Sequence, residues 1–158
     1  GLLLELGRPA EALASAETGI ALSREIGHPH LVVHGAVTSA AALAEQGDPA
    51  TALRRVEEAV ATAREIGQAM VTADALVHAV PIAMAAEDRE RAQEMLQECE
   101  ALLGDGVDHV IRGRLLRLRA EWAEDEDDRH RLLESAAMEL DRAGSYLADE
   151  VREQIVSR

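Results

Sequence analysis

Three histidines close together are the first residues in this chain whose types and spacing suggest chemistry. His30 and His34 are four residues apart, a spacing that places two imidazoles on one face of a helix, where they can ligate a metal ion such as Zn²⁺. No cysteine or acidic side chain lies between His28 and His34 to add a further ligand. The pattern therefore indicates an exposed helix start, and the sequence predicts no metal site.

Other reactive side chains are scattered and have simpler explanations. His78 lies four residues after Asp74, and two interpretations are open: Asp74 holds the imidazole, or His78 is an ordinary groove-lining or half-buried residue, which we favour. Cys99 is the single cysteine and is expected to be a small, buried, inert packing residue. The acidic run at 124–128 lacks the alternating ligands and central glycine of a calcium loop and is typical of a solvated turn before a helix. We therefore expect no catalysis and no cofactor.

A basic segment interrupts an otherwise acidic chain. Residues 112–119 contain four arginines, of which Arg114 and Arg117 follow helical spacing with Glu121. Two interpretations stay open: these arginines bind an acidic or mixed partner, or they pair with the surplus carboxylates of the chain. We favour ion pairing, because exposed ion pairs are common and weak.

Composition narrows the function classes further. The 158 residues are 47% hydrophobic and carry a formal net charge of -14, so we expect one folded domain spanning 1–158 that binds neither nucleic acid nor anionic membranes. All 16 basic residues are arginine, which excludes lysine-based chemistry and suggests a GC-rich bacterial coding sequence. With one cysteine and no apolar run long enough to cross a membrane, the expected location is the cytoplasm.

The elements that position these side chains repeat every 40 residues. The segment Gly7–Leu13 returns at 47–53, and Ser23–Gly27 returns at 63–67, with weaker echoes starting at 87 and 127. A fixed period of this length is typical of stacked helical hairpins. The hydrophobic pattern predicts an all-α fold with helices at 9–26, 29–46, 49–66, 69–86, 88–103, 107–125, 128–143 and 145–157. Pro81 predicts a kink in the helix at 69–86.

The repeat resembles a long form of the tetratricopeptide repeat over essentially the whole chain. The residues that match the family's pattern are small or apolar packing residues: Gly7 and Gly47 between helices, Ala40, Leu43 and Ala120 in first helices, and Ala12, Ala52 and Ala92 in second helices. Leu132, Glu139, Glu87 and Asp127 depart from the pattern, which indicates a degenerate last unit. The resemblance implies a right-handed superhelical solenoid of antiparallel hairpins with about four repeats, the first of them incomplete.

In that family the first helix of each unit lines a concave groove that binds other proteins. Carried over to this chain, the resemblance implies a groove that contains His34, Val37, Asp74, Val77, His78, Pro81, Arg114, Arg117 and Glu121. Repeats of this kind occur in large bacterial signalling proteins, including transcription regulators. The expected function is therefore a protein- or peptide-binding segment of such a regulator, not an enzyme. The alternatives are a small-ligand effector-sensing domain and a freestanding oligomeric scaffold.

The first residues suggest self-association. Leu2, Leu3, Leu4 and Leu6 resemble the end of a helix that a longer array would bury, with only Glu5 as a polar residue among them. We therefore expect a homodimer through this N-terminal edge, unless a preceding hairpin covers it.

Overall fold

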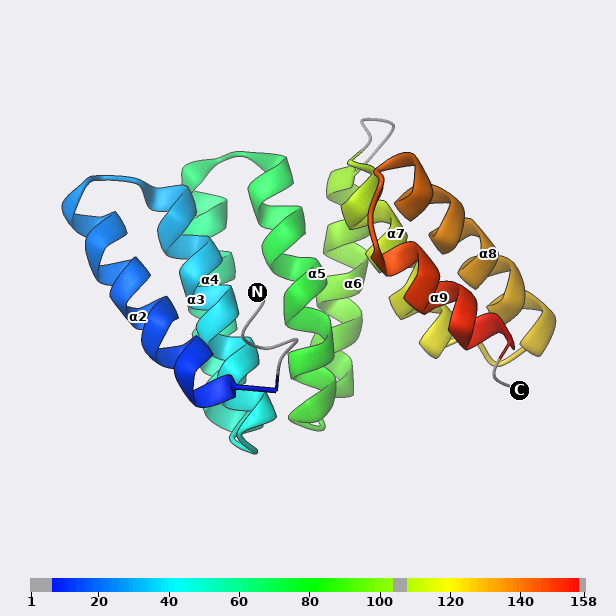
Figure 1. Ribbon diagram of the computed structural model, residues 1–158, viewed down its shortest axis with the longest axis horizontal. Helices are drawn as coiled ribbons and strands as arrows, with labels where there is room; N and C mark the ends of the chain where they lie inside the picture. The colour runs from blue at the N-terminus through cyan, green and yellow to red at the C-terminus, as the bar shows by residue number, and fades with distance from the viewer. Residues whose placement is uncertain (1–6, 104–107, 157–158) are drawn as a thin grey trace. The chain divides into compact units, whose positions relative to one another are not determined.

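The computed structural model describes residues 7–103 and 108–156, and these ranges are helical throughout, with no strand. Helices and short turns alternate along the chain (Figure 1). The eight helices of these two ranges are α2 (Pro9–Glu25), α3 (Pro29–Glu45), α4 (Pro49–Ile66), α5 (Ala69–Ala85), α6 (Arg89–Leu103), α7 (His109–Glu121), α8 (Glu126–Arg142) and α9 (Leu147–Val156). The all-α prediction is confirmed. The largest difference is at α7, which is shorter than predicted, and α9 begins two residues later than predicted. Helix α8 begins two residues earlier, because Asp125 caps it by accepting from the amide of Asp128 at 2.9 Å.

The turns between helices recur every 20 residues, which is half of the 40-residue period of the sequence. The backbone is in the left-handed region at Gly7, Gly27, Gly47, Gly67 and Glu87, spaced 20 residues apart, and the last four of these residues follow helices α2 to α5. After α3 the turn is closed by bonds from the Gly47 amide to the Ala44 carbonyl at 3.0 Å and from the Asp48 amide to the Leu43 carbonyl at 3.0 Å. This is the glycine-dependent Schellman arrangement. The hairpin repeat therefore consists of two helix-plus-turn segments of equal length.

Helix starts are also set by local sequence. Proline occupies the first turn of α2, α3 and α4, where its missing amide hydrogen is not needed. Asp48 caps α4 by accepting from the amide of Thr51 at 3.1 Å, and this bonding lowers the pKa of Asp48. Helix α5 continues through Pro81 to Ala85, and its predicted kink stays a prediction.

The chain groups into two compact units, residues 1–98 and 99–158. The prediction of a single domain over 1–158 stays a prediction. In the first unit α3 packs against α2, α4 and α5, and α4 packs against α5. Of the small or apolar residues expected to pack there, Ala12, Ala40, Ala52 and Ala92 are buried, whereas Leu43 is partly buried. Helices α2 and α3 approach closely, since a Cβ on Gly35 would lie 2.7 Å from Cγ1 of Ile20.

The second unit has its own core among α7, α8 and α9. Its buried residues are Ala120, Leu133, Ala136, Ala137, Leu140, Ala148 and Val151. Glu139, which departs from the expected small residue, is mostly buried and accepts a 2.6 Å hydrogen bond from Nδ1 of His109 and one of 2.9 Å from Arg142. The bond from His109 is the main reason that the pKa of Glu139 lies below its usual value. This hydrogen bond thus ties α7 to α8 where the repeat pattern predicts a small side chain.

Candidate functional site

A cavity of about 190 Å³ lies between α2 and α4, with α3 as its floor. Its apolar residues are Ile20 from α2, Val32, Val33 and Ala36 from α3, and Ala59 from α4; its polar residues are Glu17, Arg24, Arg55, Glu58 and Thr62. Because α2 and α4 both pack on α3, their facing sides form the two walls of this cavity. Residues that are up to 45 positions apart in the sequence, from Glu17 to Thr62, therefore line the same cavity.

One part of the cavity wall is cross-linked by three polar side chains. The Arg55 guanidinium donates to the hydroxyl of Ser39 at 2.8 Å and also pairs with the carboxylate of Glu17. The Ser39 hydroxyl donates to the same Glu17 oxygen at 3.0 Å, although Ser39 itself is fully buried. Each helix contributes one member, so this cluster links α2, α3 and α4.

The charged groups of the other two charged residues of the cavity, Arg24 and Glu58, are available to a ligand. No described residue forms a hydrogen bond or ion pair with the guanidinium of Arg24 or the carboxylate of Glu58. The Thr62 hydroxyl beside them donates to the backbone carbonyl of Glu58 at 2.9 Å. Arg24 and Glu58 lie on opposite walls and carry opposite charges, so the cavity presents one available positive group and one available negative group.

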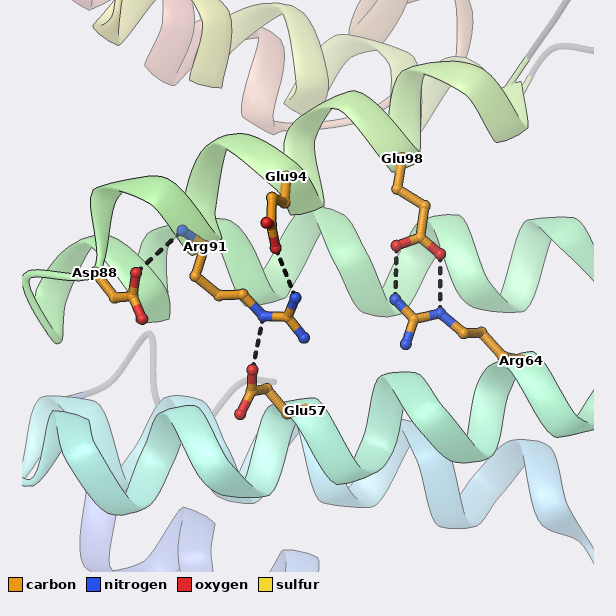
Figure 2. Close-up of polar contacts among 6 residues, drawn as sticks. All are labelled: Glu57, Arg64, Asp88, Arg91, Glu94 and Glu98. Carbon is orange, nitrogen blue, oxygen red and sulfur yellow. Dashed lines mark hydrogen bonds and ion pairs between the residues drawn. The ribbon is translucent and has the colours of Figure 1, made fainter.

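The neighbouring pair of helices, α4 and α6, is joined differently (Figure 2). Arg64 of α4 donates two parallel hydrogen bonds to Glu98 of α6, at 2.9 and 2.6 Å. Nε of Arg91 donates to Glu57 at 2.7 Å, while another nitrogen of Arg91 donates to Glu94 at 2.7 Å. The paired guanidinium of Arg64 is the main cause of a lowered pKa at Glu98. Two ion pairs therefore connect α4 to α6.

The 40-residue repeat relates these two places. Adding 40 to Arg24 and Glu58 gives Arg64 and Glu98, the bidentate pair between α4 and α6. The same step takes Ala36 to Leu76, Ser39 to Ala79 and Arg55 to Met95, and these three later residues are fully buried or nearly so. The first repeat thus has Ala36 where the second has the larger Leu76, and it has polar Ser39 and Arg55 where the second has apolar Ala79 and Met95. This substitution pattern accounts for the cavity.

The predicted groove residues of the first unit do not line this cavity. His34 on α3 is exposed, as is Pro81 on α5, whereas Val37 and Val77 are buried in the unit. Since α3 packs on α5, these residues belong to neighbouring helices. His78 is half-buried, and its Nδ1 lies 2.8 Å from the backbone carbonyl oxygen of Asp74 but 3.7 Å from the Asp74 carboxylate, so its hydrogen bond is to the backbone.

The predicted arginines lie in the second unit. Arg117 of α7 is 4.0 Å from Glu150 of α9, and Arg119 is 3.2 Å from Glu100. Arg114 is partly buried and Glu121 is the exposed last residue of α7. The contact of Arg119 with Glu100 agrees with the ion-pair interpretation, whereas the buried Nε of Arg117 has no hydrogen-bond partner among the described residues; partner binding by this segment stays a prediction.

The remaining candidates have no site geometry. Within the two described ranges, no group of three or more histidine, cysteine, aspartate or glutamate side chains could hold a metal ion. His28, His30 and His34 are exposed, and Cys99 is fully buried as expected. The leucines at 2–6 and the homodimer edge inferred from them lie outside the described residues. Among the described helices, none has both the length and the apolar character needed to cross a membrane.

Sequence reasoning missed the α2–α4 cavity, although a signal for it was present. Ala36 is shorter than Leu76, the residue 40 positions later, and this difference in size is visible in the sequence. Only the fold shows that residues of α2 and α4 line the space beside Ala36. No known family model matches this chain, and no curated protein matches it. Function must therefore be argued from the site itself.

Proposed function

We propose that the chain is a protein-interaction segment of a larger bacterial regulatory protein, formed by tetratricopeptide-like hairpins stacked as a right-handed solenoid of about four units. The equal spacing of left-handed turns and the burial of the small repeat residues support this architecture. The partner in this proposal is a protein or peptide and the location is the cytoplasm. A net charge of -14 supports the exclusion of nucleic acid and anionic membranes. We propose no enzymatic activity.

One observation carries the proposal: α2 has an exposed apolar face. Leu22 is 56% exposed and Ile26 is 55% exposed, and they lie four residues apart on one side of the helix. Gly19 on the same side is exposed, whereas Ala59, which follows it by 40 residues on α4, is only 2% exposed. The α4 face is covered because α3 packs against α4. The equivalent face of α2 is therefore suited to an α3-like amphipathic helix of a partner.

A synthetic peptide with the sequence of residues 29–45 is the probe for this face, because these residues form the helix that packs on α4. We expect the labelled peptide to bind the chain in a fluorescence anisotropy titration, and the double change Leu22→Glu and Ile26→Glu to weaken binding at least about tenfold. Met138→Glu is the control, since Met138 is a similarly exposed apolar residue on α8. Absence of binding, or equal loss in the control, would contradict the proposal.

The cavity between α2 and α4 favours a second function, the sensing of a small ligand. Such a role is compatible with an interaction segment, because the cavity and the exposed apolar face use different side chains of α2. A titration of the chain with candidate small molecules separates the two roles. Binding of a small molecule by a variant that has lost the peptide would establish sensing as an independent function.

A further inference from the structure

We infer that the α2–α4 cavity binds a small zwitterion, namely a free α-amino acid with an aliphatic side chain such as leucine or valine. This inference stands apart from the proposed partner-binding face, because it depends on Arg24, Glu58 and the α3 floor and not on Leu22 or Ile26. It assigns a ligand class to a cavity that the repeat architecture alone does not require.

The charges of the cavity select a ligand with both signs. Of its four charged side chains, Glu17 and Arg55 neutralise one another, which leaves Arg24 and Glu58 without a described partner. A carboxylate fits the guanidinium of Arg24, whose planar donors suit bidentate binding, and an ammonium group fits the carboxylate of Glu58. A simple anion would satisfy Arg24 but leave Glu58 facing a like charge. A simple cation would leave Arg24 unsatisfied.

The residues that correspond to Arg24 and Glu58 in the next repeat form an ion pair, whereas Arg24 and Glu58 are both exposed at the cavity. Arg64 and Glu98, 40 residues later, form two hydrogen bonds to each other from the same helix positions (Figure 2). In the first repeat the corresponding guanidinium and carboxylate border a cavity and do not pair with each other. A ligand that carries a carboxylate and an ammonium group can therefore bind between them, with its carboxylate paired to Arg24 and its ammonium group paired to Glu58.

The apolar part of the cavity and its size define the rest of the ligand. Ile20, Val33 and Ala36 supply an aliphatic surface to which an isobutyl or isopropyl group can add hydrophobic contact. The volume of about 190 Å³ is below the range of roughly 300–1,000 Å³ that is usual for drug-sized ligands. Since the whole chain carries a net charge of -14, an electrically neutral zwitterion also avoids the long-range repulsion that an anion meets.

The test is isothermal titration calorimetry of the full chain with L-leucine and L-valine. Three probes remove one feature each: 4-methylpentanoate lacks the ammonium group, 3-methylbutylamine lacks the carboxylate, and glycine lacks the aliphatic side chain. We expect each to bind at least about tenfold more weakly than leucine. Equal binding of either half-ligand would overturn the zwitterion assignment, and no heat from leucine or valine at tens of millimolar would overturn the site.

Variants of the cavity locate any binding. Arg24→Gln and Glu58→Gln are each expected to weaken leucine binding at least about tenfold, and Ala36→Leu to abolish it by filling the cavity. Circular dichroism shows whether each variant remains folded. The controls are Arg54→Gln and Glu65→Gln, which change similar charges on α4 outside the cavity lining. Leucine binding that survives the changes at Arg24 and Glu58, or that is lost equally in the controls, would overturn the inference.

Discussion

The space between α2 and α4 differs from the equivalent place in the next repeat, although the helices around both begin at the same 20-residue spacing. In the first repeat Ala36 and Arg55 border a cavity, and Arg24 does not pair with Glu58. In the second, Leu76 and Met95 are buried, and Arg64 pairs with Glu98. A few side chains therefore decide whether a repeated backbone arrangement is filled or hollow.

This difference shows that the repeat determines the backbone structure at a position but does not determine the chemistry of the side chain there. Positions 36 and 76 follow the same turn signals and lie in equivalent helices, so their backbones are set by the same local rules. Their side chains differ, and the shorter one leaves a lined cavity. A binding site can thus arise within a packing motif when large residues are replaced by small and polar ones, at some cost in stability.

The largest effect is expected when the filled repeat is made to resemble the hollow one. Leu76→Ala removes a fully buried side chain, and we expect the free energy of unfolding to fall by about 2–5 kcal/mol in urea denaturation. Leu31→Ala, at a 52% exposed leucine of α3, is the control and is expected to cost less than about 1 kcal/mol. Equal effects of the two changes would show that Leu76 does not fill the second repeat.

The turns give a second comparison between the same repeats. Gly47 and Glu87 follow α3 and α5, and both have positive φ, of 85° and 61°. A residue with a Cβ is strained in this conformation, so Glu87→Gly is expected to raise the free energy of unfolding by about 1 kcal/mol. Urea denaturation of the wild type and the variant measures this gain.

The reciprocal change tests whether the backbone is responsible for that effect. A Cβ on Gly47 would meet no atom within 4 Å, so Gly47→Ala isolates the conformational cost and is expected to destabilise by about 1 kcal/mol. If Glu87→Gly proves neutral while Gly47→Ala is costly, the contacts of the Glu87 side chain compensate for its backbone strain.

A third prediction makes the hollow repeat resemble the filled one. Ala36→Leu places at the cavity floor the side chain that its equivalent, Leu76, has in α5, and we expect a gain of about 1 kcal/mol in the free energy of unfolding. Ala61→Leu adds the same side chain at an exposed position of α4 and is expected to change stability by less than about 0.5 kcal/mol. Destabilisation by Ala36→Leu alone would mean that the walls cannot accommodate the larger residue.

The sequence is sufficient for the features that depend on local signals. Proline at helix starts, glycine at helix ends and Asp48 as a cap predict the helices, because each acts within one turn of the backbone. Glu87 shows the limit of such signals, since it adopts the left-handed turn without being glycine and its position follows only from the repeat.

Contacts between residues that are far apart in the sequence could not be predicted from it in the same way. The cluster of Glu17, Ser39 and Arg55 joins residues of three helices, and Glu139 pairs with a histidine 30 positions earlier. Neither spacing corresponds to one helical face or to the repeat, so the sequence contains no periodic signal for them. The predicted groove was carried over from a family pattern, which specifies helix positions but not which side chains are buried.

The smallest expected effect concerns the ion pair that distinguishes the two repeats. Hydrogen bonding from Arg64 holds the pKa of Glu98 below its usual value of 4.5. The ionised carboxylate therefore stabilises the folded state at pH values above 4.5, and this contribution disappears as the pH falls through the lowered pKa. Because both side chains are more than one-third exposed, solvent screening limits the contribution to about 0.2–1 kcal/mol.

Glu98→Gln is accordingly expected to lower the free energy of unfolding by up to about 1 kcal/mol at neutral pH, and the difference from wild type should disappear as the pH falls below the lowered pKa of Glu98. Glu58→Gln is the matched control, because Glu58 occupies the equivalent position without an ion pair to any described residue. Its difference from wild type should remain small across the same pH range. Urea denaturation of the three proteins at several pH values measures both profiles. A pH-dependent loss of equal size at Glu58 would show that the carboxylates of both repeats are paired in solution, which would remove the electrostatic difference between them and leave only the difference in packing.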